Sequence, residues 1–211
     1  WSSDVCSSDL DDDSDSIKVV LLGDTGTGKT TLLIRYTDKT VQSSTHPTIG
    51  VAIKTYQFQN DDQKYQIQVW DTAGQEAFKS ITPLYCRNCK AAMLVYDITS
   101  KDSFQNLNSW LKVLNREGIN QFVIVGNKSD LSDRREVSFN DGLRYATINS
   151  ANFFETSAIN NRFVDEAFAN LSILAIKSAN KEHSICSENG VNLNMLETQE
   201  TNESINRRKC C

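Results

Sequence analysis

Long apolar runs are absent from this 211-residue sequence, and no stretch approaches the roughly 20 apolar residues that a membrane-spanning helix requires. The N-terminal residues also lack the pattern of a secretory signal peptide. An excess of positive charge is missing too, since the formal net charge is −5. A chain of this charge has no general attraction to nucleic acid, so we expect no nucleic acid among its partners.

A disulfide framework is absent as well, although the sequence contains six cysteines. Their spacing in a chain of this length matches no disulfide scaffold, which favours a reducing cytosol. Cys86 and Cys89 form a Cys-x-x-Cys pair, but no second pair accompanies it. Unpaired thiols are therefore the simpler interpretation, and a zinc or redox role is the weaker alternative.

The composition divides the chain into three parts. Residues 1–16 include an acidic run and are predicted to be a disordered acidic N-terminus, of which the first ten residues resemble translated adapter sequence. Residues 17–179 carry the apolar patterns of one globular domain. From residue 180 onward Asn, Glu, Ser and Thr dominate, so residues 180–211 are predicted to be a flexible tail.

Within the central part, short apolar runs alternate with amphipathic segments. The expected strands are 17–22, 51–58, 64–71, 91–96, 122–125 and a short one at 153–154. Helical spacing marks 32–36, 104–114, a segment after the capping-box residue Ser138, and 164–175. The alternation predicts an α/β fold, a doubly wound and mostly parallel six-stranded sheet with one antiparallel edge strand.

A glycine-rich loop follows the first predicted strand. The stretch Gly23-Asp-Thr-Gly-Thr-Gly-Lys-Thr30 fits Gly-x-x-x-x-Gly-Lys-[Ser/Thr], and a helical pattern comes directly after it. Backbone N–H groups of such a loop surround phosphate, the lysine reaches the β- and γ-phosphates, and the last hydroxyl binds Mg²⁺. The predicted phosphate-binding residues here are Gly23, Asp24, Thr25, Gly26, Thr27, Gly28, Lys29, Thr30 and Thr31.

Two segments that follow this loop suit the γ-phosphate and its metal ion. Thr48 could close over the phosphate and complete the Mg²⁺ shell. Asp71 ends an apolar strand, where an acid holds Mg²⁺ directly or through water. Gly74 permits close backbone approach to the γ-phosphate, and Gln75 can orient a water for in-line attack.

Two later segments suit a guanine base. In Asn127-Lys-Ser-Asp130 the aspartate can accept from both N1–H and the exocyclic amine of guanine, a donor pair that adenine lacks. The stem of Lys128 can lie along the base. Backbone N–H groups of Glu155-Thr-Ser-Ala158 can meet guanine O6. The glycine loop and these four later segments, in this order, leave little room for chance. Asn127-Lys-Ser-Asp130 in particular disfavours an ATPase or kinase.

Taken together, these segments resemble the Ras superfamily of small GTPases, and within it the Rab family. The resemblance covers residues 17–178 and the last two residues. It is carried by Ile49-Gly-Val-Ala-Ile-Lys54, Tyr65-Gln-Ile-Gln-Val-Trp-Asp-Thr-Ala-Gly74, Phe78-Lys-Ser-Ile-Thr82, Leu94-Val-Tyr-Asp-Ile-Thr99, Asn106-Leu-Asn-Ser-Trp-Leu111 and the terminal pair Cys210-Cys211. It implies the small G-protein form of the P-loop NTPase fold.

The resemblance implies a GTP/GDP switch in membrane traffic, in which two loops, about residues 41–50 and 73–85, become ordered around GTP and Mg²⁺. It implies catalysis by Gln75 and binding of effectors through Ile49, Gly50, Ile53, Trp70, Phe78 and Tyr85. The guanine site that it implies comprises Val41, Asn127, Lys128, Asp130, Ser157, Ala158 and Ile159.

The same resemblance implies partners and a location. The partners are a guanine nucleotide exchange factor, a GTPase-activating protein, effectors, an escort protein, a dissociation inhibitor and a geranylgeranyl transferase that modifies Cys210 and Cys211. We expect a monomer that cycles between the cytosol and the cytoplasmic face of an intracellular membrane through two lipid chains.

Several positions depart from the family pattern. Val41 stands where an aromatic residue usually touches guanine, and Ile159 replaces a lysine, so both bear on nucleotide affinity. Ile53 and Ala77 replace a phenylalanine and an arginine, which bears on the choice of partners. Thr25 stands beside the expected γ-phosphate, where its methyl could crowd the catalytic water. A GTP-binding scaffold that hydrolyses poorly is therefore the alternative to a hydrolysing switch.

Overall fold

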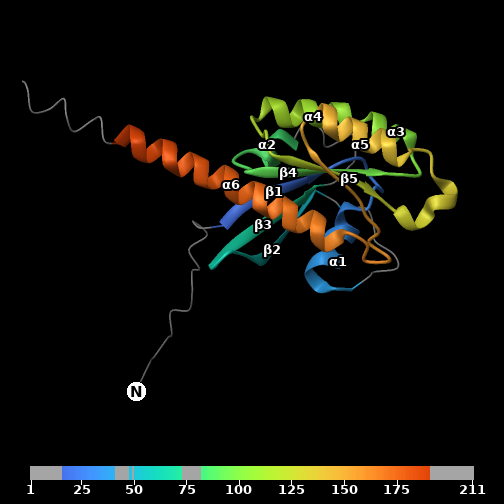
Figure 1. Ribbon diagram of the computed structural model, residues 1–211, viewed down its shortest axis with the longest axis horizontal. Helices are drawn as coiled ribbons and strands as arrows, with labels where there is room; N and C mark the ends of the chain where they lie inside the picture. The colour runs from blue at the N-terminus through green and yellow to red at the C-terminus, as the bar shows by residue number, and fades with distance from the viewer. Residues whose placement is uncertain (1–15, 41–47, 49, 73–81, 191–211) are drawn as a thin grey trace, which may run out of the picture.

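The computed structural model describes residues 16–40, 48, 50–72 and 82–190, of which residues 82 and 182–190 are described by their backbone alone. Their strands form one sheet between two layers of helices (Figure 1). The strands are β1 (Ser16–Leu22), β2 (Val51–Asn60), β3 (Gln63–Thr72), β4 (Ala91–Asp97), β5 (Phe122–Asn127) and β6 (Asn152–Glu155). The helices are α1 (Lys29–Asp38), α2 (Thr82–Cys86), α3 (Lys101–Gln105), α4 (Leu107–Arg116), the 3-10 helix η3 (Ser129–Arg134), α5 (Phe139–Ile148) and α6 (Val164–Gly190).

The strand order β2-β3-β1-β4-β5-β6 confirms the predicted sheet. Every neighbouring pair is parallel except β2 and β3, which form an antiparallel hairpin at one edge. The hairpin turn is tighter than the predicted 59–62, because Gln59 and Asn60 pair with Lys64 and Gln63. The carboxyl ends of β1, β4 and β5 lie at one edge, where ligands bind in such sheets.

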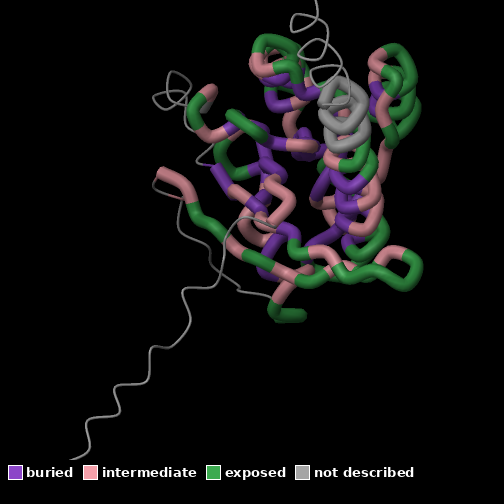
Figure 2. The backbone as a smooth tube through the Cα atoms, turned by 90° about the vertical axis from the view of Figure 1, so that its left-hand side faces the viewer, coloured by how far each residue is buried: buried purple, intermediate pink, exposed green. Residues whose placement is uncertain are grey.

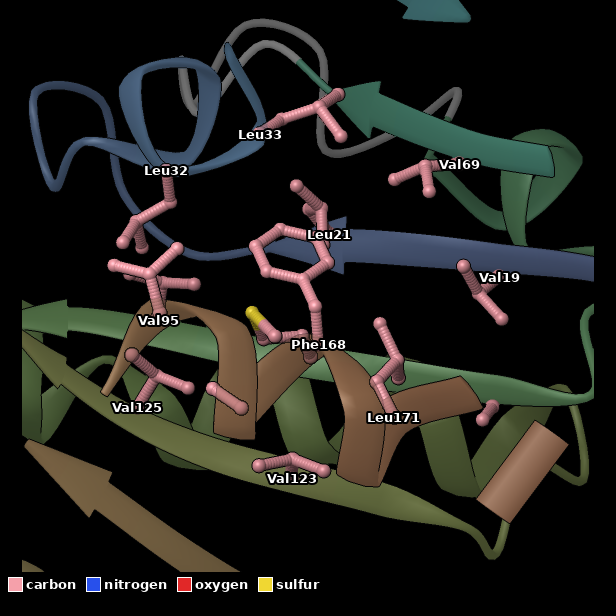
Figure 3. Close-up of a cluster of buried hydrophobic side chains, with 14 of the residues drawn as sticks. Val19, Leu21, Leu32, Leu33, Val69, Val95, Val123, Val125, Phe168 and Leu171 are labelled. Atoms are coloured by element: carbon pink, nitrogen blue, oxygen red, sulfur yellow. The ribbon is translucent and has the colours of Figure 1, made fainter. Parts of the chain in front are cut away.

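Two apolar cores hold the helices against the sheet. On one face, side chains of α1 and α6 point toward those of β1, β3, β4 and β5, and Figure 3 shows Phe168 among them. On the other face, α2, α4 and α5 cover a second cluster that includes Trp110. All residues of β4 and β5 are buried, as expected for central strands covered on both sides. Figure 2 shows buried segments inside and exposed ones outside.

The helices differ from the predictions at two places. The expected helix over 104–114 is two segments, α3 and α4, that meet at Asn106. The helical pattern over 164–175 also belongs to a longer helix, because α6 continues through residues 180–190 of the predicted tail and projects beyond the sheet (Figure 1). No proline, and no glycine before Gly190, interrupts it. Within the described residues, none of the helices combines the length and apolarity required to cross a bilayer.

Candidate functional site

The glycine loop joins β1 to α1 at the carboxyl edge of the sheet. Gly23 has a φ of 143°, and a Cβ there would lie 2.0 Å from the carbonyl oxygen of Val95. Gly28 has a φ of 92°, and its Cβ would lie 2.3 Å from Nδ2 of Asn127. Both positions therefore require glycine. The first turn of α1 carries no acidic residue, so nothing offsets the positive potential at the start of this helix.

Lys29 extends back under this loop. Its Nζ donates to the carbonyl oxygens of Gly23 at 2.7 Å and Asp24 at 2.9 Å, and the residue is only 5% exposed. Burial lowers the pKa of Lys29 to about 8, although Asp71 and Asp24 favour its charged form. A buried ammonium group with a third donor is suited to an anion above the loop.

Thr30, Thr48 and Asp71 come from three separate segments and meet beside Lys29. Thr30 Oγ1 donates to Asp71 Oδ2 at 2.5 Å, so the contact between the two threonine hydroxyls at 2.8 Å must have Thr48 as its donor. Asp71 is fully buried, and its Oδ1 has no hydrogen-bond partner among the described residues. Burial raises the pKa of Asp71, while the Thr30 hydroxyl and Lys29 lower it.

This arrangement fits Mg²⁺. The ion prefers oxygen ligands and is usually held by one or two carboxylates together with water and substrate phosphates. The unpartnered Asp71 oxygen and the two adjacent hydroxyls provide such a set. Within residues 16–40, 48, 50–72 and 82–190, no group of three or more His, Cys, Asp or Glu side chains is placed to hold a metal ion. These residues therefore offer no second metal site built from protein side chains alone.

Asn127 joins the predicted guanine segment to the glycine loop. Its Nδ2 donates to the Thr27 carbonyl oxygen at 2.8 Å, and its Oδ1 accepts from the Thr156 hydroxyl at 3.2 Å. The asparagine is 2% exposed, so both bonds are shielded from water. Asn127 was predicted from the sequence to bind the base. The geometry shows that it also joins the glycine loop at Thr27 to the segment after β6 at Thr156.

Asp130 and Lys128 are each held by a further residue. Asp130 Oδ1 accepts from the Ser157 hydroxyl at 2.5 Å. Lys128 has a φ of 66°, and its Nζ lies 2.6 Å from Asp97 Oδ2. Thr99 fixes the other Asp97 oxygen through its N–H and hydroxyl, at 2.8 and 2.7 Å. Asp97 was not among the predicted site residues, because an acid at the end of a strand gives no sign of its distant partner.

Arg35 of α1 supports the last predicted segment. Its Nε donates to the Ala158 carbonyl oxygen at 2.6 Å, and its second terminal nitrogen donates to the Ile159 carbonyl oxygen at 2.7 Å. Ala158 is buried and Ile159 is 53% exposed. The helix that begins at the glycine loop thus also positions the loop after β6. These two hydrogen bonds join residues more than 120 positions apart in the sequence, and no sequence motif predicts them.

The other predicted residues divide into three groups. Those outside the described residues are Val41, Ile49, Gly74, Gln75, Phe78, Cys210 and Cys211. Those that are exposed or partly exposed, in the glycine loop or directly after it, are Thr25, Gly26 and Thr31. Those on or near the β2–β3 hairpin are Gly50, Ile53, Trp70 and Tyr85.

In that third group, Ile53 is 48% exposed and pairs in register with Trp70, whose ring centroid lies 6.1 Å from that of Tyr85. Cys86 and Cys89 are buried free thiols, which confirms the simpler interpretation. Burial raises the pKa of each to about 12, so neither is a reactive thiolate near neutral pH.

Comparison with known proteins agrees with this geometry. Residues 18–177 match the Ras family. The chain is similar to the GTP-binding protein ypt1 of Schizosaccharomyces pombe, with 38% identity over 197 residues, 92% of this chain and 96% of that protein. It is also similar to the Ras-related protein Rab-22A of Canis lupus familiaris, with 44% identity over 160 residues, 74% of this chain and 81% of that protein. The chain therefore belongs to the Ras family, as a Rab-type small GTPase.

Proposed function

We propose that this chain is a guanine-nucleotide switch that hydrolyses GTP and recruits effectors to regulate vesicle and membrane traffic. The observation that carries the proposal is the bond from Asn127 to Thr27, because it joins a phosphate cradle to a base-recognition segment in one rigid site. Family membership supports the same conclusion. As a Rab-type protein the chain has exchange factors, activating proteins and effectors as its general classes of partner.

On this proposal the glycine loop and Lys29 hold the phosphates. Backbone N–H groups of residues 23–31 surround the anion, and the buried ammonium compensates its charge. Gly74 and Thr48 would approach the γ-phosphate. Mg²⁺ would be held by Thr30, Thr48 and Asp71, directly or through water for Asp71, and would supply charge compensation for the β- and γ-phosphates.

The base is read at the other end of the site. Asp130 accepts from guanine, and the Lys128 stem covers one face of the ring. The backbone N–H of Ala158 would meet O6, because the N–H of Ser157 already donates to the Arg162 carbonyl oxygen at 3.1 Å. Ile159 and Val41 would lie at the rim. Because Ser157 and Asp97 already fix Asp130 and Lys128, the cost of ordering these side chains is met before the nucleotide binds.

Hydrolysis on this proposal depends on Gln75, which orients the attacking water. No arginine among the proposed site residues resembles an arginine finger in cis, so the intrinsic rate should be slow and an activating protein should accelerate it. A poorly hydrolysing scaffold is the weaker alternative, because the relatives favour a working GTPase.

GDP binding should weaken as the pH rises above 8. The pKa of Lys29 is about 8 without ligand, and phosphate charge will raise it, so binding above pH 8 must take up a proton. This linkage predicts a Kd about eightfold weaker at pH 9 than at pH 7.5. Titration calorimetry at constant ionic strength measures it.

Lys29→Arg is the matched control, because arginine stays charged throughout this range. Guanine itself begins to lose its N1 proton at about pH 9, which also weakens GDP binding. The pH dependence of the Kd of Lys29→Arg measures this contribution of the base alone. Equal pH dependence in the two proteins would show that Lys29 does not contact the phosphates. The stability of the ligand-free protein should change with pH in the opposite direction. The free-energy cost of burying charged Lys29 is present in full below pH 8, and it falls as the pH rises from 8 toward the ordinary lysine pKa of 10.5.

We also propose that Cys210 and Cys211 are prenylated by a geranylgeranyl transferase, with an escort protein and a dissociation inhibitor governing delivery and extraction. Two lipid chains give the stable anchoring that one cannot, and the adjacent Arg207, Arg208 and Lys209 add attraction to anionic lipid. The double change of both cysteines to serine should move the protein from membranes to cytosol without altering GDP affinity. Membrane fractionation decides this, and undiminished membrane association would require another anchor.

A further inference from the structure

We propose that Trp110 and Asn106 are positioning residues for the nucleotide, acting through the carboxylate of Asp24. The inference rests on the proposed function, because it concerns the same phosphate loop. It assigns a role to a polar contact between this loop and the helix pair α3–α4, which covers one face of the sheet (Figure 1). We call this contact the Asp24 clamp.

The clamp engages both oxygens of one carboxylate. Trp110 Nε1 donates to Asp24 Oδ1 at 2.8 Å, and Asn106 Nδ2 donates to Asp24 Oδ2 at 2.7 Å. These donors lie 86 and 82 residues away in sequence. Asp24 is the second residue of the glycine loop, so the clamp fixes the loop where the chain leaves β1.

The main chain of Asp24 serves the cradle while its side chain serves the clamp. Its carbonyl oxygen accepts from Lys29 Nζ at 2.9 Å and from the Thr27 hydroxyl at 2.9 Å. The carboxylate is bound instead to α3–α4. One residue therefore links the buried ammonium of the phosphate site to the helix pair α3–α4.

Both donors are themselves held in place. Trp110 is 1% exposed and lies in an apolar cluster with Leu107 and Leu114. Asn106 occupies the junction of α3 and α4, where its backbone N–H donates to Asp102 and its carbonyl oxygen accepts from the Ser109 hydroxyl at 2.6 Å. The interruption of the expected helix thus occurs at the residue whose amide reaches Asp24.

An acidic side chain in a phosphate-binding loop would repel its ligand if it were free to turn toward it. Two donors from a rigid layer hold this carboxylate elsewhere, yet its charge still favours the ammonium form of Lys29. Loss of one donor lets the carboxylate move and loosens the loop entrance. That loss penalises the nucleotide-bound state, so the effect should be found mainly in the rate of nucleotide release.

Trp110→Phe tests the clamp, because phenylalanine keeps an aromatic ring in the core but removes the indole N–H. We expect fluorescent GDP to dissociate about tenfold faster from this variant, from the size of a hydrogen bond to a charged group. In an Asp24→Ala background the same change should have no further effect, since no carboxylate remains to be held. Leu114→Ala, one helical turn away in the same core, should lower stability and leave the release rate within about twofold of wild type.

A wild-type release rate in Trp110→Phe, or equal acceleration with and without Asp24, would overturn the proposal. The amide NMR spectrum of the ligand-free protein gives an independent readout. The Trp110 indole N–H resonance should lose its hydrogen-bonded shift and its protection from exchange in Asp24→Ala, and an unmoved resonance would disprove the contact. Failure of wild type to bind GDP at all would instead refute the proposed function, while the indole resonance would still report on the clamp.

Discussion

Asp130→Asn should change the nucleotide preference of this protein from guanine to xanthine by about a hundredfold or more, because a site built for paired hydrogen bonds strongly rejects an unmatched base. The carboxylate can accept from two guanine donors, whereas an asparagine amide would place its N–H groups against the guanine amine. Xanthine has an oxygen at that position and can accept from the new amide. The shape of the site is otherwise preserved.

The neighbour of Asp130 explains why the asparagine should point the required way. Ser157 Oγ donates to Asp130 Oδ1 and accepts from the Asn160 backbone N–H at 3.1 Å, so its hydroxyl proton is committed to residue 130. In the variant the amide oxygen therefore stays at Ser157 and the amide nitrogen faces the base.

Competition binding with GDP and xanthosine diphosphate measures this change. Asp133→Asn is the matched control, because Asp133 lies on the same 3-10 helix, is exposed, and should leave the preference unaltered. Persistent preference for GDP in Asp130→Asn would remove Asp130 from the base site.

Gly28→Ala should nearly abolish nucleotide retention. The new Cβ would lie 2.3 Å from Asn127 Nδ2 on a backbone with φ of 92°, so either the asparagine or the loop must move. Positive-φ strain costs about 1–3 kcal/mol. Loss of the buried bond from Asn127 to Thr27 costs a further 1–3 kcal/mol or so. Together these correspond to affinity that is weaker by roughly 30-fold to 10⁴-fold, at about 1.4 kcal/mol per decade.

Gly118→Ala separates the two causes. Gly118 also has a positive φ, 72°, but its added Cβ would meet nothing within 4 Å, and it lies outside the proposed site. This variant should lose about 1 kcal/mol of stability and keep wild-type GDP affinity. Thermal unfolding and GDP titration of both variants provide the measurements, and tight GDP binding by a folded Gly28→Ala protein would contradict the proposed loop geometry.

Local patterns were sufficient to predict the sheet and the phosphate cradle. The continuous apolar runs of β4 and β5 predicted central strands because both faces of these strands are buried. The glycine loop was evident because its glycines, lysine and threonine fall at a fixed spacing within one short segment. The length of α6 was not evident, because the composition changes at residue 180 while no residue there forces the helix to end.

The supporting contacts of the site could not be predicted in the same way. Arg35, Asp97 and Trp110 each act on a residue that is distant in sequence, and their spacing carries no sign of that partner. Trp110 belongs to the helical apolar pattern over 104–114 and is buried, but such a pattern does not show where an indole N–H will point. Such residues become visible only when the strands and helices are packed together.

Single-turnover hydrolysis of GTP by the purified chain with Mg²⁺ is the measurement that tests the proposed function most directly. We expect a slow intrinsic rate, on the order of 10⁻⁴ to 10⁻³ per second without an activating protein. Gln75→Leu should lower this rate further while GTP binding remains unchanged. If the wild-type chain binds GTP but releases phosphate no faster than Gln75→Leu, the chain does not hydrolyse GTP through Gln75, and the proposed hydrolysing switch is wrong.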